Sequence, residues 1–140
     1  MTRRLVFLLF ALTLSSTYAG ELLVVVHKSN PTNELNKTQL IDLYMGKYVA
    51  FPNGEIAKPI DIAQGEDVKQ VFYKHLVGLS LARVNAYWSR LRFSGRVQPP
   101  LELETEQQVI DYLASHHNAI GYISERNLTK NLKVVYRIHE

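Results

Sequence analysis

The chain has 140 residues, of which 46% are hydrophobic and 21% are charged, with no cysteine and a formal net charge of +3. This composition is typical of a globular protein, and it excludes collagen-like, low-complexity, disordered and disulfide-stapled proteins. The lack of cysteine also excludes thiol and disulfide redox chemistry.

Residues 1–19 have the pattern of a secretory signal peptide. Two arginines near the start precede an apolar run at residues 5–14, and a Thr-Tyr-Ala sequence predicts cleavage near Ala19. The apolar run is shorter than the roughly 18 to 20 residues needed to cross a bilayer, so we expect an exported chain whose mature part has no membrane span. Cleavage would leave 14 basic against 13 acidic residues, a balance that argues against nucleic-acid binding.

The mature chain, residues 20–140, is long enough for one domain. Residues 22–26 form an apolar run that predicts a short strand buried on both faces, as in a parallel sheet. A helix follows Asn36, whose spacing to Gln39 is that of a capping box, and we expect it to end at Gly46.

A second strand is predicted at residues 59–62, and the next helix runs from Gly65 to Gly78 with a single apolar stripe. Ser80 is the expected N-cap of a third helix, which ends near Gly95. Strands and helices therefore alternate in the first half of the mature chain.

The Pro-Pro pair at residues 99–100 predicts an extended crossing, and the spacing of Thr105 and Gln108 predicts a fourth helix. Two more strands are predicted at residues 119–123 and 132–138. We therefore expect a single α/β domain with a mostly parallel sheet, about four flanking helices and right-handed crossovers.

Several of these segments resemble the periplasmic solute-binding proteins of ABC transporters, in particular the phosphate type. The most specific are Leu-Tyr-Met-Gly-Lys at residues 43–47 and Ala-Ile-Gly-Tyr-Ile at residues 119–123. The resemblance implies two α/β lobes that clamp a ligand between them, and this chain has room for one. The other matching segments are residues 23–27, 29–31, 39–42, 51–54, 59–62 with Phe72, and Asn118.

In that family the ligand lies at a helix N-terminus introduced by a motif of the form Arg-x-x-x-Ser-Gly-Thr. The corresponding stretch here runs from Asp61 to Asp67 and has neither the arginine nor the hydroxyl residues. Instead, Glu66 and Asp67 lie in the first turn of the predicted helix, where carboxylates satisfy the free backbone donors and repel an incoming anion.

We predict a ligand surface where the strands end and the helices begin, along the carboxyl edge of the sheet. Arginines next to a serine and a glycine at the end of the third helix could extend it as an anion nest, or could simply stabilise the helix C-terminus. The predicted lining residues are Ser29, Asn30, Gln64 and Gly65, with Arg92, Ser94 and Arg96 as additions.

We interpret the histidines and the aromatic residues of the third helix as structural residues. The adjacent His116 and His117 point in different directions, so no metal site is predicted, and we expect no other cofactor. His27 and His75 are interpreted as packing residues. The aromatic residues of the third helix are interpreted first as core; they are Tyr87, Trp88 and Phe93.

We predict that the protein is not an enzyme. The mature chain has neither of the serine-nucleophile motifs Gly-x-Ser-x-Gly and Ser-x-x-Lys. Its candidate carboxylates are interpreted as helix N-terminal and surface charges. They are Asp61, Glu66, Asp67, Glu102, Glu104 and Glu106.

Two functional hypotheses follow. The first is a non-enzymatic, periplasmic solute-binding protein that resembles the phosphate ABC-transporter component, with a small anion such as phosphate as ligand and the transporter as partner. The second is a lobe that has lost its ligand and serves as an interaction or sensor subunit of a cell-envelope complex. The acidic pair Glu66 and Asp67 and the single lobe motivate the second hypothesis.

Overall fold

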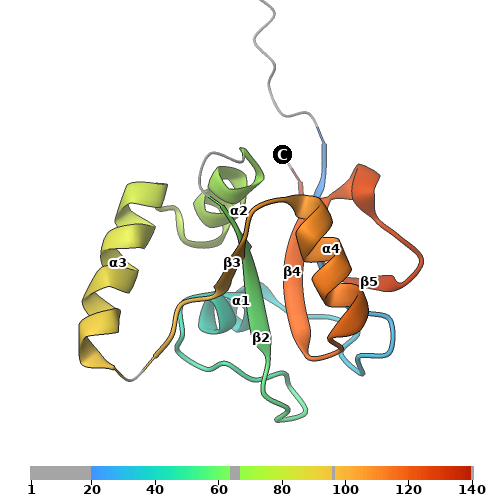
Figure 1. Cartoon of the computed structure of the whole chain (residues 1–140), viewed down its shortest axis with the longest axis horizontal. Coiled ribbons are helices and arrows are strands. Elements are labelled where there is room, and N and C mark those ends of the chain that lie inside the picture. Colours follow the sequence, from blue (N-terminus) through green and yellow to red (C-terminus); the bar gives the residue numbers. More distant parts are fainter. Residues whose placement is uncertain (1–19, 64–66, 96, 140) are drawn as a thin grey trace, which may run out of the picture.

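The computed structural model describes residues 20–63, 67–95 and 97–139. Within these ranges, five strands form one sheet, and four α-helices and one 3-10 helix connect them (Figure 1). The elements are β1 (Leu22–His27), α1 (Lys37–Tyr44), β2 (Lys58–Ile62), α2 (Asp67–Val77), α3 (Leu81–Ser94), β3 (Leu101–Leu103), α4 (Glu106–Ser115), β4 (Ala119–Ser124), η1 (Glu125–Asn127) and β5 (Leu132–Ile138).

The strand order is β3-β2-β4-β1-β5. β2 pairs in parallel with β3 and β4, whereas β1 pairs antiparallel with β4 and β5. Four strands therefore run in one direction and β1 runs in the other, which confirms a mostly parallel sheet with four helices. The interpretation of β1 itself as a parallel strand is wrong, because any central strand covered on both faces shows the same continuous apolar pattern.

The helices cover the two faces of the sheet unequally. α4 lies alone on one face, where Gly121 of β4 allows Val109 and Leu113 to approach the backbone closely. α1 and α2 cover the other face through aromatic rings: Phe72 stacks on Tyr122 with ring centroids 3.9 Å apart. α3 packs against α2 and stands at the outer side of the molecule (Figure 1).

Local capping explains where the helices begin. Asn36 forms the predicted capping box with Gln39, and the Ser80 hydroxyl accepts a hydrogen bond from the Arg83 amide (3.4 Å). Thr105 caps α4, but the Gln108 side chain accepts from the amide of Glu104 and not from that of Thr105, so this capping box is incomplete. Helices α1, α2 and α3 are each followed by a glycine with positive φ.

Two expectations about the middle of the chain need correction. The segment after the Pro-Pro pair was expected only as an extended crossing, and it forms the edge strand β3. On α3, Trp88 is buried and Tyr87 is half-buried, but Phe93 is 96% exposed, so Phe93 is not a core residue. No helix in the described ranges is long and apolar enough to span a membrane.

Candidate functional site

A buried polar cluster lies at the carboxyl end of β2 and consists of Asp61, Lys69, Tyr73 and Tyr122; we call it the Asp61 cluster. Asp61 is only 6% exposed. Its carboxylate accepts hydrogen bonds from the hydroxyls of Tyr73 (2.6 Å) and Tyr122 and from the Ile62 amide (2.9 Å). The interpretation of Asp61 as a helix N-terminal or surface charge is therefore wrong.

Lys69 supplies the positive charge of the Asp61 cluster from α2. It is 2% exposed, and its Nζ atom lies 3.8 Å from Asp61 Oδ2 and 2.9 Å from Glu102 Oε2. Burying an ammonium group is costly unless carboxylates compensate it, so both contacts stabilise this arrangement. Glu102 lies on the edge strand β3 with its side chain half exposed, and it connects the buried cluster to the surface.

Burial decides which groups of the Asp61 cluster carry protons. Desolvation raises the pKa of Asp61, while the charge of Lys69 and the hydrogen bonds from Tyr122 and Tyr73 lower it. Desolvation, reinforced by the charge of Asp61, holds the pKa values of Tyr73 and Tyr122 well above 10. The two tyrosines therefore remain protonated and donate their hydrogen bonds to the Asp61 side chain.

This geometry bears on the predicted anion site at the start of α2. Three groups, one each from α2, β2 and β4, already donate hydrogen bonds to the carboxyl group of Asp61. Asp67 lies exposed in the first turn of α2. The donors around Asp61 are therefore already engaged, and the carboxylate of Asp67 disfavours an anion there. The predicted site residues Gln64 and Gly65 lie outside the described residues.

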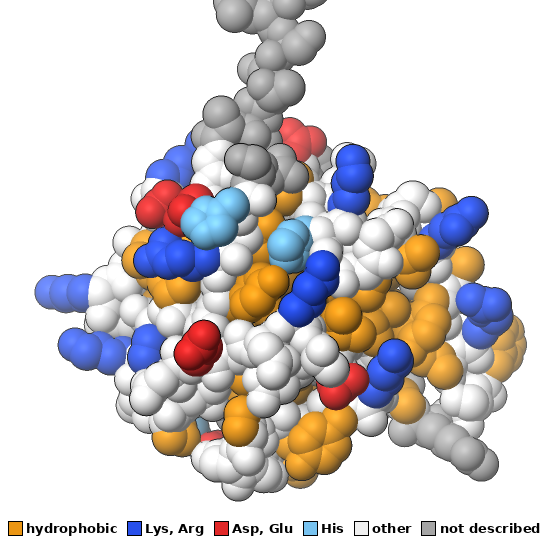
Figure 2. Space-filling view, turned by 180° about the vertical axis from the view of Figure 1, so that it is seen from behind, with side chains coloured by type: hydrophobic (Ala, Val, Ile, Leu, Met, Phe, Trp, Pro, Cys, Tyr) orange, Lys and Arg blue, Asp and Glu red, His pale blue; other side chains and the backbone are white. Residues whose placement is uncertain are grey.

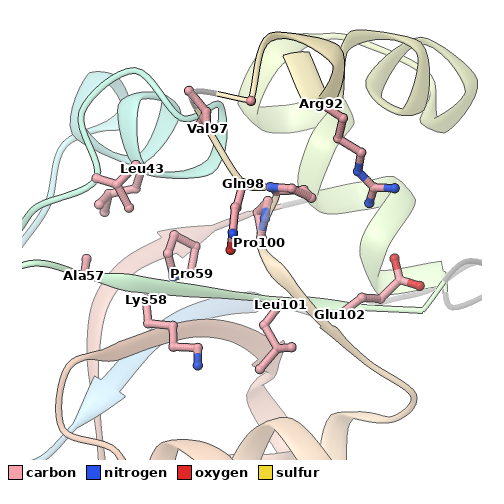
Figure 3. A pocket seen from close by; sticks show the side chains of 13 residues that line it. Leu43, Ala57, Lys58, Pro59, Arg92, Val97, Gln98, Pro100, Leu101 and Glu102 are labelled. Atoms are coloured by element: carbon pink, nitrogen blue, oxygen red, sulfur yellow. The ribbon is translucent and has the colours of Figure 1, made fainter. Parts of the chain in front are cut away.

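An open cleft of about 750 Å³ lies between the end of α3, the amino end of β2 and β3, and Glu102 on its wall contacts Lys69 of the Asp61 cluster. Arg92 of α3 and Glu102 of β3 point toward each other across it, and Gln98 adds an amide (Figure 3). Apolar side chains form much of the remaining wall, among them Leu43, Val49, Pro59, Val97, Pro100 and Leu101. The cleft therefore combines a cation, a carboxylate and an amide with apolar walls, which is the composition typical of a small-molecule site.

The structure separates the predicted site residues. Because β1 runs opposite to β2, Ser29 and Asn30 lie at the amino edge of β2 and β4, away from the carboxyl end of β2. Asn30 is buried there, where its Nδ2 donates to the His117 carbonyl (2.7 Å) and its Oδ1 accepts from the Thr32 amide (2.8 Å). The assumption of a single carboxyl edge for β1 and β2 was therefore wrong.

Two of the other predicted residues lie at the end of α3. Arg92 lines the cleft, and the hydroxyl of Ser94 donates to the Leu91 carbonyl (2.6 Å), which ties it to the last turn of the helix. Arg96 lies outside the described residues.

The histidines take part in local contacts. His75 Nε2 lies 3.0 Å from the Tyr136 hydroxyl, and the ring of His116 stacks on Tyr112. His117 instead lies 3.0 Å from Glu55, so the two adjacent histidines have different partners. Over the described ranges, no group of three or more His, Asp or Glu side chains is arranged to hold a metal ion.

Sequence reasoning missed most of the Asp61 cluster. One signal was available: Asp61 lies between Ile60 and Ile62 in a strand with apolar neighbours, and a carboxylate in that place needs donors. Its partners Tyr73 and Tyr122 are 12 and 61 residues away along the chain, so no local motif reveals them.

Comparisons with known proteins add the fold relationship. No family model matches the sequence, and no curated protein matches it significantly. Solved structures do match. A protein from Clostridium perfringens, described as a phosphate ABC transporter substrate-binding protein with bound phosphate, aligns with a TM-score of 0.65 and 18% identity over 83% of this chain. An ABC-type phosphate transport receptor from Vibrio cholerae gives a TM-score of 0.64 and 18% identity over 81% of this chain.

PstS from Borrelia burgdorferi is similar at a TM-score of 0.62 with 10% identity. At these identities the similarity shows a shared fold. The chain spans less than half of these proteins, 45%, 44% and 47% of their lengths, so it corresponds to a half-sized relative of the phosphate-type substrate-binding fold.

Proposed function

We propose that this protein is a non-enzymatic, exported binding module that holds a small solute in the cleft between α3 and β2–β3. The observation that carries the proposal is this cleft on a substrate-binding-protein fold, with Arg92 and Glu102 on facing walls. By analogy with its structural relatives, the module acts in the periplasm and its partner is an ABC transporter.

A small anion such as phosphate binds at Arg92 in this proposal and not at the start of α2. An arginine fork presents paired N–H donors to phosphate oxygens, and the Gln98 amide lies on the same cleft. At the start of α2 the anion would meet the exposed carboxylate of Asp67, whereas Glu102, the carboxylate that faces Arg92 across the cleft, is ion-paired with Lys69 (2.9 Å).

Equilibrium titration with phosphate, with sulfate as a comparison anion, tests the proposal. Replacing Arg92 by Gln removes a charged hydrogen-bond donor worth about 1.5 to 3 kcal/mol, so we expect the Kd for phosphate to rise about 10-fold to 100-fold. The matched control is Arg126→Gln on η1, an exposed arginine outside the cleft lining, which should leave the Kd unchanged. No binding at millimolar phosphate would reject the phosphate version.

One observation favours the second candidate, an interaction or sensor subunit of a cell-envelope complex without a solute. The place where the phosphate-type relatives are expected to hold their anion contains Asp61 with its own donors. A thermal melt separates the candidates, because a solute at about 100 times its Kd stabilises the protein by roughly 2.7 kcal/mol. A panel of oxyanions and neutral solutes that leaves the Tm unchanged would support the second candidate.

A further inference from the structure

The sequence carries two adjacent blocks of opposite charge. From residue 68 to residue 101 there are six basic residues and no acidic one. From residue 102 to residue 125 there are five acidic residues and neither lysine nor arginine. The basic block contains Lys69, Lys74, Arg83, Arg90, Arg92 and Arg96, and the acidic block contains Glu102, Glu104, Glu106, Asp111 and Glu125.

The fold places the boundary between these blocks at the cleft. α3, from the basic block, forms one wall, and the edge strand β3, which opens the acidic block, forms the other. The right-hand side of Figure 2, where α3 lies, shows Lys and Arg side chains among hydrophobic ones. We call the exposed arginines of α3 the positive half of this surface and the exposed Glu104, which follows β3, its negative half; Glu102 is ion-paired with Lys69, and Lys58 of β2 also lines the cleft.

Much of the charge on this surface is not neutralised within the chain. Arg83, Arg90 and Arg92 are exposed, and none of them forms an ion pair with another described residue. On the other half, Glu104 is exposed and likewise forms no ion pair over the described ranges. These groups are available to a partner of complementary charge.

The positive half also exposes an apolar side chain: Phe93 is 96% exposed. An aromatic ring flanked by arginines is a composition enriched at the centre of protein interfaces.

We propose that two copies of this chain associate through this surface, so that α3 of each copy faces β3 and Glu104 of the other. A surface with a positive and a negative half is self-complementary under a two-fold axis that passes through the boundary, which is the arrangement that a symmetric dimer needs. The second copy then closes the cleft, and only this closure over a solute rests on the proposed function.

The charge pattern favours a second copy over other occupants. An anionic membrane or a uniformly acidic protein would be attracted by α3 and repelled by Glu104. A second copy offers both signs in the required order. One helix face and a three-residue strand form a small interface, so we expect a weak dimer with a Kd in the micromolar to millimolar range.

Sedimentation velocity of the solute-free protein, from 10 μM to 1 mM at low and at high salt, tests the association. We expect a monomer–dimer equilibrium that weakens at least 10-fold in 500 mM salt, because charge pairs at an exposed interface are screened. Phe93→Ser should weaken it as well, while Lys130→Glu, an exposed change in the turn before β5, should not.

A charge-swap pair makes the test specific. Arg90→Glu alone and Glu104→Lys alone should each be monomeric, since like charges then face each other across the two-fold axis. An equimolar mixture of the two variants should dimerise again, because every contact is complementary in the mixed dimer. Far-UV circular dichroism of each variant checks that it is folded. Glu102 stays unchanged because it compensates the buried Lys69.

Three results would overturn the proposal: a monomer up to 1 mM, a dimer indifferent to both charge changes, or a monomer that instead sediments with phosphatidylglycerol vesicles. Because the protein is solute-free, the dimer and the proposed function fail separately. A dimer that binds no solute would reject solute binding alone, and a monomer that binds phosphate would reject the dimer alone.

Discussion

Gly46 lies just after the end of α1, next to residues that line or support the cleft. Its φ is +71°, and a Cβ atom there would lie 2.5 Å from Val97 Cγ1 and 2.9 Å from Trp88 Cη2. Val97 lines the cleft and Trp88 is the buried ring of α3. The lack of a side chain at Gly46 therefore sets how closely α3 and the segment after it approach α1.

We expect Gly46→Ala to destabilise the fold by about 2 to 4 kcal/mol, from backbone strain together with overpacking. Gly54→Ala is the matched control, because Gly54 also has positive φ but a Cβ atom there would have no neighbour within 4 Å. The control should lose only the backbone contribution, about 1 to 2 kcal/mol. Urea denaturation measures both, and equal losses would contradict this account of Gly46.

The burial of Asp61 makes the stability of the fold depend on pH. The group ionises near its ordinary pKa of 3.8 in the unfolded chain and at a higher pH in the folded protein, because burial raises its pKa. Its contribution to stability is therefore fully present below that ordinary pKa and is lost as the pH rises through the folded pKa. The unfolding free energy of the wild type should fall relative to that of Asp61→Asn between pH 3 and pH 7. A relative rise over this range would contradict the burial argument.

At the scale of the elements, α4 lies directly on β4 because Gly121 has no side chain. A Cβ atom at Gly121 would lie 2.8 Å from Val109 Cγ1 and 3.2 Å from Leu113 Cδ1. Gly121→Ala should cost about 1 to 3 kcal/mol through overpacking. Val109→Ala removes the closest atom, so the double variant should be more stable than the sum of the single losses predicts, by about 0.5 kcal/mol or more. A double-mutant cycle in urea measures this coupling, and strict additivity would contradict it.

The elements also show what a sequence can reveal. Helices α1, α3 and α4 were predictable because their N-caps, Asn36, Ser80 and Thr105, act within a few residues. β3 was missed because a strand of three residues is too short to show an alternation of apolar and polar side chains. The direction of β1 was missed for a different reason: it depends on which strands lie beside it, and β4 and β5 come about 100 residues later.

At the scale of the molecule, the direction of β1 decides where the predicted site residues lie. A strand running opposite to β2 carries Ser29 and Asn30 to the other edge of the sheet, so the predicted site divides in two. Arg92 was predicted because three arginines near one helix end are visible in the sequence. Glu102 and Lys69 were not, because their ion pair joins residues that are 33 apart along the chain, one on α2 and one on β3. The overall fold and one cleft residue were therefore predictable, and the buried cluster beside the cleft was not.

The central claim is that the cleft, and not the start of α2, holds a small anion. An NMR titration of the 15N-labelled protein with phosphate tests it most directly, because every backbone amide reports on its own surroundings. We predict shifts concentrated at Arg92, Gln98 and Leu101, which saturate with a single Kd. Shifts confined to the residues around Asp67, or no shifts at millimolar phosphate, would contradict the claim.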